Sequence, residues 1–164
     1  MFREMISKVA LLISFITLAS CSTSSSISVV NPEKLNDNFT VSSILVKDST
    51  AKLLDIDIEK LMKVAVENEL SKQGILDLSD NGYILRISII NYAKGNAFAR
   101  WMLPGAGKTS LSVKADVFNN QEILIANAQA ERSVSAGGGY TIGAWEQVFD
   151  DVAKALVADF LSLK

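Results

Sequence analysis

Residues 109–118 alternate between apolar and polar side chains, a period of two that is typical of a β-strand with one buried face. The predicted inner face carries Leu111, Val113, Ala115 and Val117. Residues 83–92 are apolar on both faces of the expected strand, which favours a central position in the sheet. Residues 39–47 and 122–134 are further strand candidates. Asn119 and Asn120 precede the last of these segments and indicate a hairpin, because asparagine tolerates positive φ.

Two other segments carry apolar residues at helical spacing. Residues 57–73 place apolar side chains at Ile58, Leu61, Met62, Ala65, Val66 and Leu70, and Gly74 follows as a natural stop. Asp57 and Glu59 stand at the start, where negative charge suits the helix dipole. Residues 144–163 carry a second stripe, formed by Trp145, Val148, Phe149, Val152, Leu156, Phe160 and Leu163.

The order of these elements is β-α-β-β-β-α, which predicts an α/β fold. We expect a two-layer sandwich in which two helices cover one face of a mixed, mostly antiparallel sheet. The first strand and the strand after the helix could pair in parallel through a right-handed crossover. The 164 residues have room for one such domain, assigned to residues 39–164.

The N-terminus has the pattern of an export signal. Arg3 and Lys8 precede an apolar run at 9–19, which is shorter than the roughly 20 residues of a spanning helix. Leu18, Ala19, Ser20 and Cys21 resemble the lipobox of bacterial lipoproteins. This resemblance implies a signal peptide at 1–20, cleavage between Ser20 and Cys21, and lipid on the Cys21 thiol. The alternatives are an ordinary cleaved signal peptide with an incidental cysteine, or an N-terminal anchor helix.

Residues 21–38 are predicted to be the lipidated cysteine and a flexible tether. The segment after Cys21 is rich in serine and lacks periodicity, so its side chains bury too little apolar area to offset ordering entropy. Ser22 follows the cysteine, which resembles the sorting pattern of outer-membrane lipoproteins. We therefore expect a lipid-anchored protein of the cell envelope, on the outer membrane and facing the periplasm.

Composition removes several classes of function. The sequence contains no histidine, which excludes histidine-based acid–base catalysis and histidine-ligated metals. Cys21 is the only cysteine, so a disulfide framework and a cysteine zinc site are excluded too. The net charge of −2 gives no basic excess for a nucleic-acid partner. We expect no enzyme activity, no cofactor and no metal.

Residues 100–109 read RWMLPGAGKT and invite two interpretations. Gly107, Lys108 and Thr109 imitate the end of a phosphate-binding loop, but Met102 occupies the position that requires glycine, and a strand follows where a helix is needed. Nucleotide binding is therefore not expected. The second interpretation is a partner-docking loop, formed by Arg100, Trp101, Met102, Leu103, Gly105, Gly107 and Lys108. Alternatively, these side chains fold back over the sheet.

The segment 100–111, the strand up to Phe118, the hairpin, and the glycine-rich loop into Trp145 with its closing helix resemble a family of small bacterial lipoproteins, roughly over residues 39–163. This is the domain-of-unknown-function family 4410, whose members carry an arginine and a G-x-G-[KRS] turn before a strand. The matching positions here are Arg100, Gly105, Gly107 and Lys108. The Asn-Asn hairpin departs from the Asp and Gly that relatives often have. The resemblance implies a location and a fold, and it implies no activity.

Two functions remain after these exclusions. The first is a non-enzymatic accessory or assembly factor that is anchored to the membrane through lipid on Cys21 and docks to another envelope protein. The second is a binding module for a small apolar or lipidic ligand held between the helices and the sheet.

Overall fold

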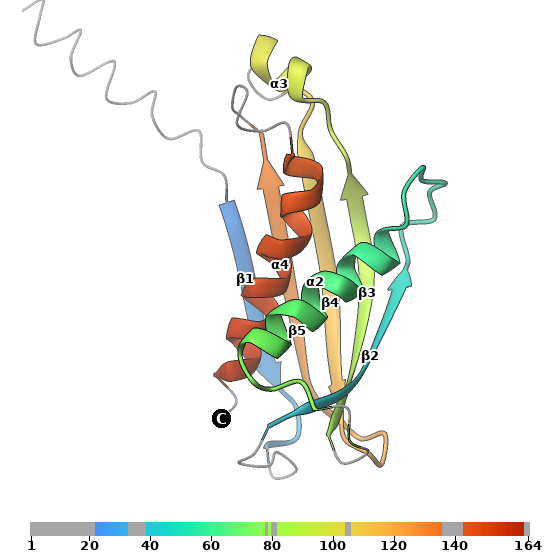
Figure 1. Ribbon diagram of the computed structural model, residues 1–164, viewed down its shortest axis with the longest axis vertical. Coiled ribbons are helices and arrows are strands. Elements are labelled where there is room, and N and C mark those ends of the chain that lie inside the picture. The colour runs from blue at the N-terminus through green and yellow to red at the C-terminus, as the bar shows by residue number, and fades with distance from the viewer. Residues whose placement is uncertain are drawn as a thin grey trace, which may run out of the picture.

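One five-stranded sheet with two helices across one face makes up most of the computed structural model (Figure 1). The structure describes residues 22–32, 39–77, 79, 82–103, 106–135 and 143–162. The predicted signal peptide, Cys21 and Gly105 lie outside these residues. Among the described helices, none is long and apolar enough to cross a membrane.

The sheet has the strand order β1-β5-β4-β3-β2. Its members are β1 (Ser22–Val29), β2 (Val41–Asp48), β3 (Tyr83–Ala93), β4 (Thr109–Phe118) and β5 (Leu124–Val134). β2 and β3 pair in parallel, with Ile44 opposite Leu85, and the other neighbours are antiparallel. The predicted α/β sandwich with a mixed, mostly antiparallel sheet is confirmed.

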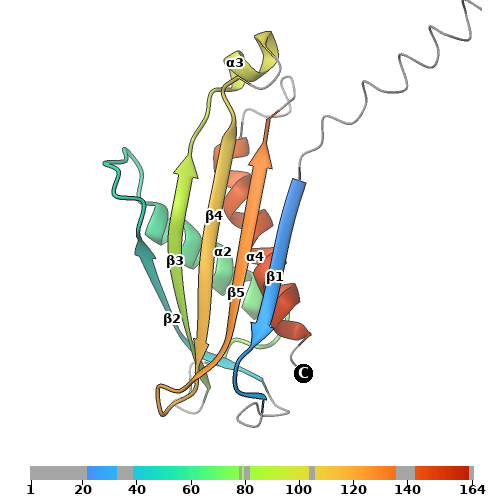
Figure 2. The ribbon, with the colours of Figure 1, turned by 180° about the vertical axis from the view of Figure 1, so that it is seen from behind.

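The two long helices are α2 (Ile58–Lys72) and α4 (Ala144–Leu161), and both predicted segments are confirmed. They cover the same face of the sheet and leave the other face open (Figure 2). Asp57 caps α2, where its Oδ1 accepts a hydrogen bond of 2.9 Å from the backbone N–H of Lys60. Gly74 follows the C-terminal cap with a φ of +66°.

Strand β1 replaces part of the predicted flexible tether. Ser22–Val29 pairs along its whole length with β5, from Ser22 opposite Ser133 to Val29 opposite Ala126. The tether prediction considered only side chains, whereas an edge strand is held by backbone hydrogen bonds that serine makes as well as valine. Residues 33–38 of the predicted tether lie outside the described residues. The ordered sheet therefore begins one residue after Cys21.

A short helix, α3 (Ala97–Met102), was also not predicted. It lies in the connection between β3 and β4, beyond the end of the sheet (Figure 1). The side chain of Asn96 caps it by accepting a 3.0 Å hydrogen bond from the backbone N–H of Ala99. Six residues are too few to show helical periodicity, so the sequence pattern gave no signal for this element.

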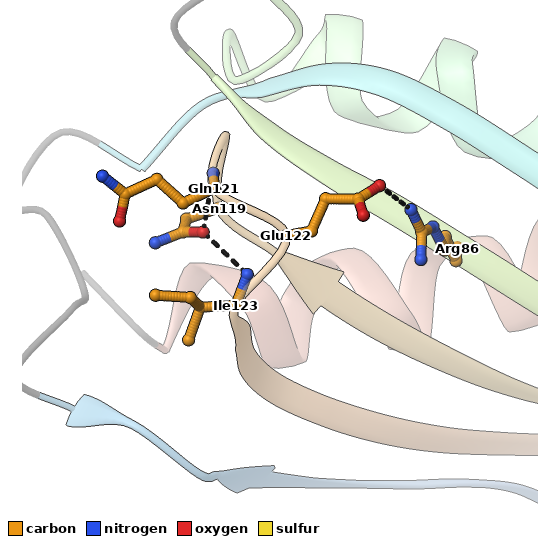
Figure 3. A network of polar contacts seen from close by, with 5 residues as sticks. All are labelled: Arg86, Asn119, Gln121, Glu122 and Ile123. Atoms are coloured by element: carbon orange, nitrogen blue, oxygen red, sulfur yellow. Dashed lines mark hydrogen bonds and ion pairs between the residues drawn. The ribbon is translucent and has the colours of Figure 1, made fainter.

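The β4–β5 hairpin is confirmed, although its mechanism differs from the prediction. Asn119 acts through its side chain, whose Oδ1 accepts hydrogen bonds of 2.9 Å from the backbone N–H groups of Gln121 and Ile123 (Figure 3). The positive φ of +60° falls on Glu122. The Glu122 carboxylate forms a 2.7 Å ion pair with Arg86 of β3, which ties the hairpin to the neighbouring strand.

The core lies between the sheet and the two long helices. Leu111, Val113, Ala115 and Val117 of β4 are buried there, as the alternation predicts. Aromatic contacts join distant parts of the chain, since the Phe39 ring stacks on Tyr83 at 4.9 Å between centroids and lies 6.2 Å from Phe160 of α4.

Replacing Phe160 with alanine should lower the free energy of unfolding by about 3–5 kcal/mol, because its fully buried ring would leave a cavity. Chemical denaturation measures the change. Phe98→Ala is the matched control, since that ring is 67% exposed and its loss should change the stability by less than about 0.5 kcal/mol. Equal losses in the two variants would contradict this account of the core.

Candidate functional site

The described part of the connection between β3 and β4, residues 94–103 and 106–108, contains α3 and presents the largest group of exposed apolar side chains at one end of the sheet. We call these residues the α3 tip. Phe98, Trp101, Met102 and Leu103 are 67%, 63%, 54% and 65% exposed. The rings of Phe98 and Trp101 lie 5.9 Å apart and form one surface. These side chains do not fold back over the sheet.

Arg100 lies on the opposite side of α3 and is 4% exposed. Its Nη1 donates hydrogen bonds of 2.7 Å to the carbonyl oxygen of Gly107 and 2.6 Å to Oγ1 of Thr109. The Thr109 hydroxyl in turn donates to the carbonyl oxygen of Lys94 at 2.8 Å. Arg100 was predicted to belong to a docking surface, but its head group holds together both ends of the connection and the start of β4.

Gly107 also contributes to the hydrogen bonds around Arg100, and it does so through its backbone. Its φ is +60°, and a Cβ atom at this position would overlap the carbonyl oxygen of Asn96. The close approach brings the backbone N–H of Asn96 to 2.9 Å from the carbonyl oxygen of Gly107. Gly107 of the G-x-G-K motif therefore has a structural reason here, which is close backbone packing beneath α3.

Lys94 and Lys108, the two lysines of the α3 tip, differ in their surroundings. Lys94 forms a 3.2 Å ion pair with Asp55 and lies 5.1 Å from the centre of the Trp145 ring. Lys108 is exposed. The structure thus separates the predicted docking residues into two groups: Arg100 and Gly107 support the α3 tip, whereas Trp101, Met102, Leu103 and Lys108 are at its surface. Phe98, which the docking interpretation also counted among the apolar side chains of this segment, lies at the same surface.

Two titratable groups have displaced pKa values, and packing explains both. Burial raises the pKa of Tyr92 to about 12, reinforced by the carboxylates of Asp55 and Glu146, and the Tyr92 hydroxyl donates to the carbonyl oxygen of Trp145 at 3.3 Å. A hydrogen bond from Gln73 lowers the pKa of Glu69. Within the described residues, no three His, Cys, Asp or Glu side chains gather as a metal site would require.

Hollows lined by described residues lie outside the layer between helices and sheet. One follows the open face and is lined largely by polar side chains of β1, β4 and β5, including Ser24, Lys114 and Glu131. Another runs along β2 and α2, where Leu45 meets Lys60. The predicted ligand position between helices and sheet is occupied by side chains that are themselves fully buried, such as Met62, Leu111 and Leu156.

Comparison with protein families gives a match to the model described as "Domain of unknown function (DUF4410)" over residues 28–138. This match confirms the resemblance drawn from residues 100–111. The matched range begins inside β1 and ends before Trp145 and α4, so the closing helix does not contribute to it. A comparison with curated proteins gave no significant match.

Solved structures share the fold at low identity. The PelC dodecamer from Paraburkholderia phytofirmans matches with a TM-score of 0.58 and 12% identity, over 84% of this chain and 97% of its own. A variant of the same dodecamer gives 0.51 and 13%, over 81% and 97%. A protein from Caulobacter crescentus CB15, provisionally described as a lipoprotein, gives 0.38 and 16%, over 75% and 86%. The first two similarities show a common fold.

Gly107→Ala should destabilise the protein more than Gly74→Ala does. Both residues have a φ near +60°, so both variants incur a backbone cost of about 1–2 kcal/mol. A Cβ atom at Gly74 would meet no neighbour, whereas one at Gly107 would meet Asn96 and Ala99, which should add at least about 1 kcal/mol. Denaturation gives both values, and equal losses would contradict the close packing beneath α3.

Proposed function

The chain belongs to the DUF4410 family, and we propose that it is a lipoprotein of the cell envelope that acts as an accessory or assembly factor through contacts with other protein chains. It is anchored through lipid on Cys21, on the outer membrane and facing the periplasm. It performs no catalysis of its own.

The position of Cys21 is the observation that supports anchoring through lipid. The only cysteine of the chain follows an apolar run of signal-peptide length and precedes the first residue of β1 directly. No other thiol competes for modification. Two or more acyl chains on one cysteine give stable membrane attachment, whereas one chain gives only marginal binding.

Contacts between protein chains are favoured by the edges of the sheet. β1 and β2 are its outermost strands. Within the described residues β1 has a neighbour on one side only, and the outer side of β2 is bridged only at its first residue, where Val41 pairs with Leu76. Such an edge presents unpaired backbone N–H and C=O groups, which are available to a strand of another chain. PelC, which shares the fold, is described as a dodecamer. Association of this chain, with itself or with another envelope protein, accords with both facts.

A role without catalysis is supported by the chemistry that the sequence and the site offer. The chain has no histidine, and lipidation uses its only thiol. The displaced pKa values belong to Tyr92, which packs against Phe149, and to Glu69, on the surface of α2. The exposed surfaces, and not a reactive constellation, are the distinctive features of the described residues.

Cys21→Ser should abolish incorporation of labelled palmitate and leave the precursor uncut, because the thiol is the acceptor of the lipid. Labelling in cells and the electrophoretic size of the chain measure both effects. Ser79→Cys in the Cys21→Ser background is the control, since it restores a thiol in an exposed turn without restoring the signal. Labelling that survives Cys21→Ser would contradict the anchor.

Ser26→Lys should weaken association, because it puts a charge on the exposed edge strand β1. The mass of the detergent-extracted protein, measured by light scattering, should shift from an assembly toward the single chain. Gln121→Lys adds the same charge in the exposed turn between β4 and β5, which are both interior strands, and should leave the mass unchanged. A wild-type chain that is monomeric and free of companions would contradict the proposal.

A further inference from the structure

We propose that the α3 tip inserts its exposed apolar side chains into the surface of the lipid bilayer. Phe98, Trp101, Met102 and Leu103 would enter the interface between headgroups and acyl chains. The inference rests on the proposed lipidation of Cys21, and it adds a second point at which the protein touches the membrane. It assigns a lipid occupant to the surface that the sequence suggested as a docking loop for a protein.

Strand pairing places the anchor and the α3 tip at the same end of the sheet. Ser22 lies opposite Ser133, Ser133 opposite Ser110, and Ser110 opposite Ala93, the last residue of β3. α3 begins four residues after Ala93 and rises beyond the strand ends (Figure 1). Strands are spaced by about 4.8 Å, so β1 and β4 are about 10 Å apart across the sheet.

Very little chain separates the lipid from this end. Cys21 adjoins Ser22, and one residue of extended chain spans about 3.3 Å. A flexible tether of 17 residues would have left the domain free to turn, but β1 is part of the sheet and removes that freedom. The end of the sheet that carries α3 is therefore held toward the bilayer.

The chemistry of the α3 tip suits a lipid interface. Aromatic side chains with a polar edge, such as tryptophan, favour the boundary between headgroups and acyl chains. The sequence has no Asp or Glu from position 81 to position 115, so no carboxylate of this segment opposes anionic headgroups. Exposed Lys108 follows α3 and suits their phosphates.

The α3 tip is also held firmly enough to act as a fixed surface. An isolated helix of six residues is not stable in water. Here Arg100 joins α3 to Gly107 and Thr109, and Asn96 caps its first turn. The apolar side chains consequently project from a supported turn.

Quenching of Trp101 fluorescence by brominated lipids tests the inference. The lipidated full-length product is reconstituted into vesicles of phosphatidylethanolamine and phosphatidylglycerol that carry bromine on the acyl chains. Trp145→Phe leaves Trp101 as the only tryptophan. We expect its emission to move to shorter wavelength and to lose most of its intensity when the lipids are brominated.

A matched control moves the fluorophore to the opposite end of the sheet. In the chain with Trp101→Phe and Trp145→Phe, Gln121→Trp places it in the exposed β4–β5 turn (Figure 3), about 30 Å away along a strand of ten residues. This chain should show no quenching. If Trp145→Phe prevents folding, the wild-type chain and Trp101→Phe give the Trp101 contribution by difference.

Several outcomes overturn the inference. Trp101 that stays unquenched in vesicle-bound, lipidated protein shows that the α3 tip does not reach the bilayer. Equal quenching at position 121 shows that the anchor imposes no orientation. Trp101 emission at short wavelength without vesicles, in an assembly of larger mass, assigns the surface to a protein. The mass of the N-terminal peptide separately tests the proposed function, since a Cys21 without lipid contradicts the anchor and the orientation that depends on it.

Discussion

The buried guanidinium of Arg100 is the constraint on which the α3 tip depends. A cation removed from water must find acceptors nearby, and Arg100 finds the carbonyl oxygen of Gly107 and the hydroxyl of Thr109. These two acceptors lie on the chain that returns to β4, so the arginine joins both sides of the connection. Glycine at 107 follows from the same geometry, because any Cβ atom there would overlap Asn96. Arg100 and Gly107, two residues of the family's motif, thus hold α3 beyond the end of the sheet in this chain.

The sequence predicts those elements that are stabilised by the burial of particular side chains. It does not predict those that are held mainly by backbone hydrogen bonds. The alternation of β4 and the apolar stripe of α2 were readable, because burial selects residue types. The acidic start of α2 was readable as well, but the hydrogen bond by which Asp57 caps it was not. β1 was not, since a serine-rich edge strand is held by backbone pairing with β5. The position of Arg100 was misjudged, because its acceptors come from residues seven and nine positions away. The spacing between Arg100 and Gly107 is visible in the sequence. The sequence does not show that the arginine side chain turns back to the Gly107 carbonyl oxygen, which the structure does.

The edge position of β1 changes the mechanical relation between the anchor and the domain. A tether attaches a domain without orienting it, whereas a strand that starts beside Cys21 would transmit the direction of the proposed anchor to the whole sheet. β1 is also an outer strand, so the edge nearest to the anchor is available for pairing with another chain. The proposed anchor and the proposed association surface therefore belong to one structural element.

Affinity and orientation then have different physical sources. Each buried acyl methylene contributes about 0.8 kcal/mol, and two acyl chains together bury far more apolar area than the side chains of the α3 tip. Complete burial of one large apolar side chain contributes roughly 1.5–3 kcal/mol, and the four exposed side chains would be partly buried in the interface. On these magnitudes the proposed contact of the α3 tip would add little to the proposed attachment by lipid. It would instead supply a second contact point, which would fix the tilt of the sheet and so the way in which the edges of associating chains meet.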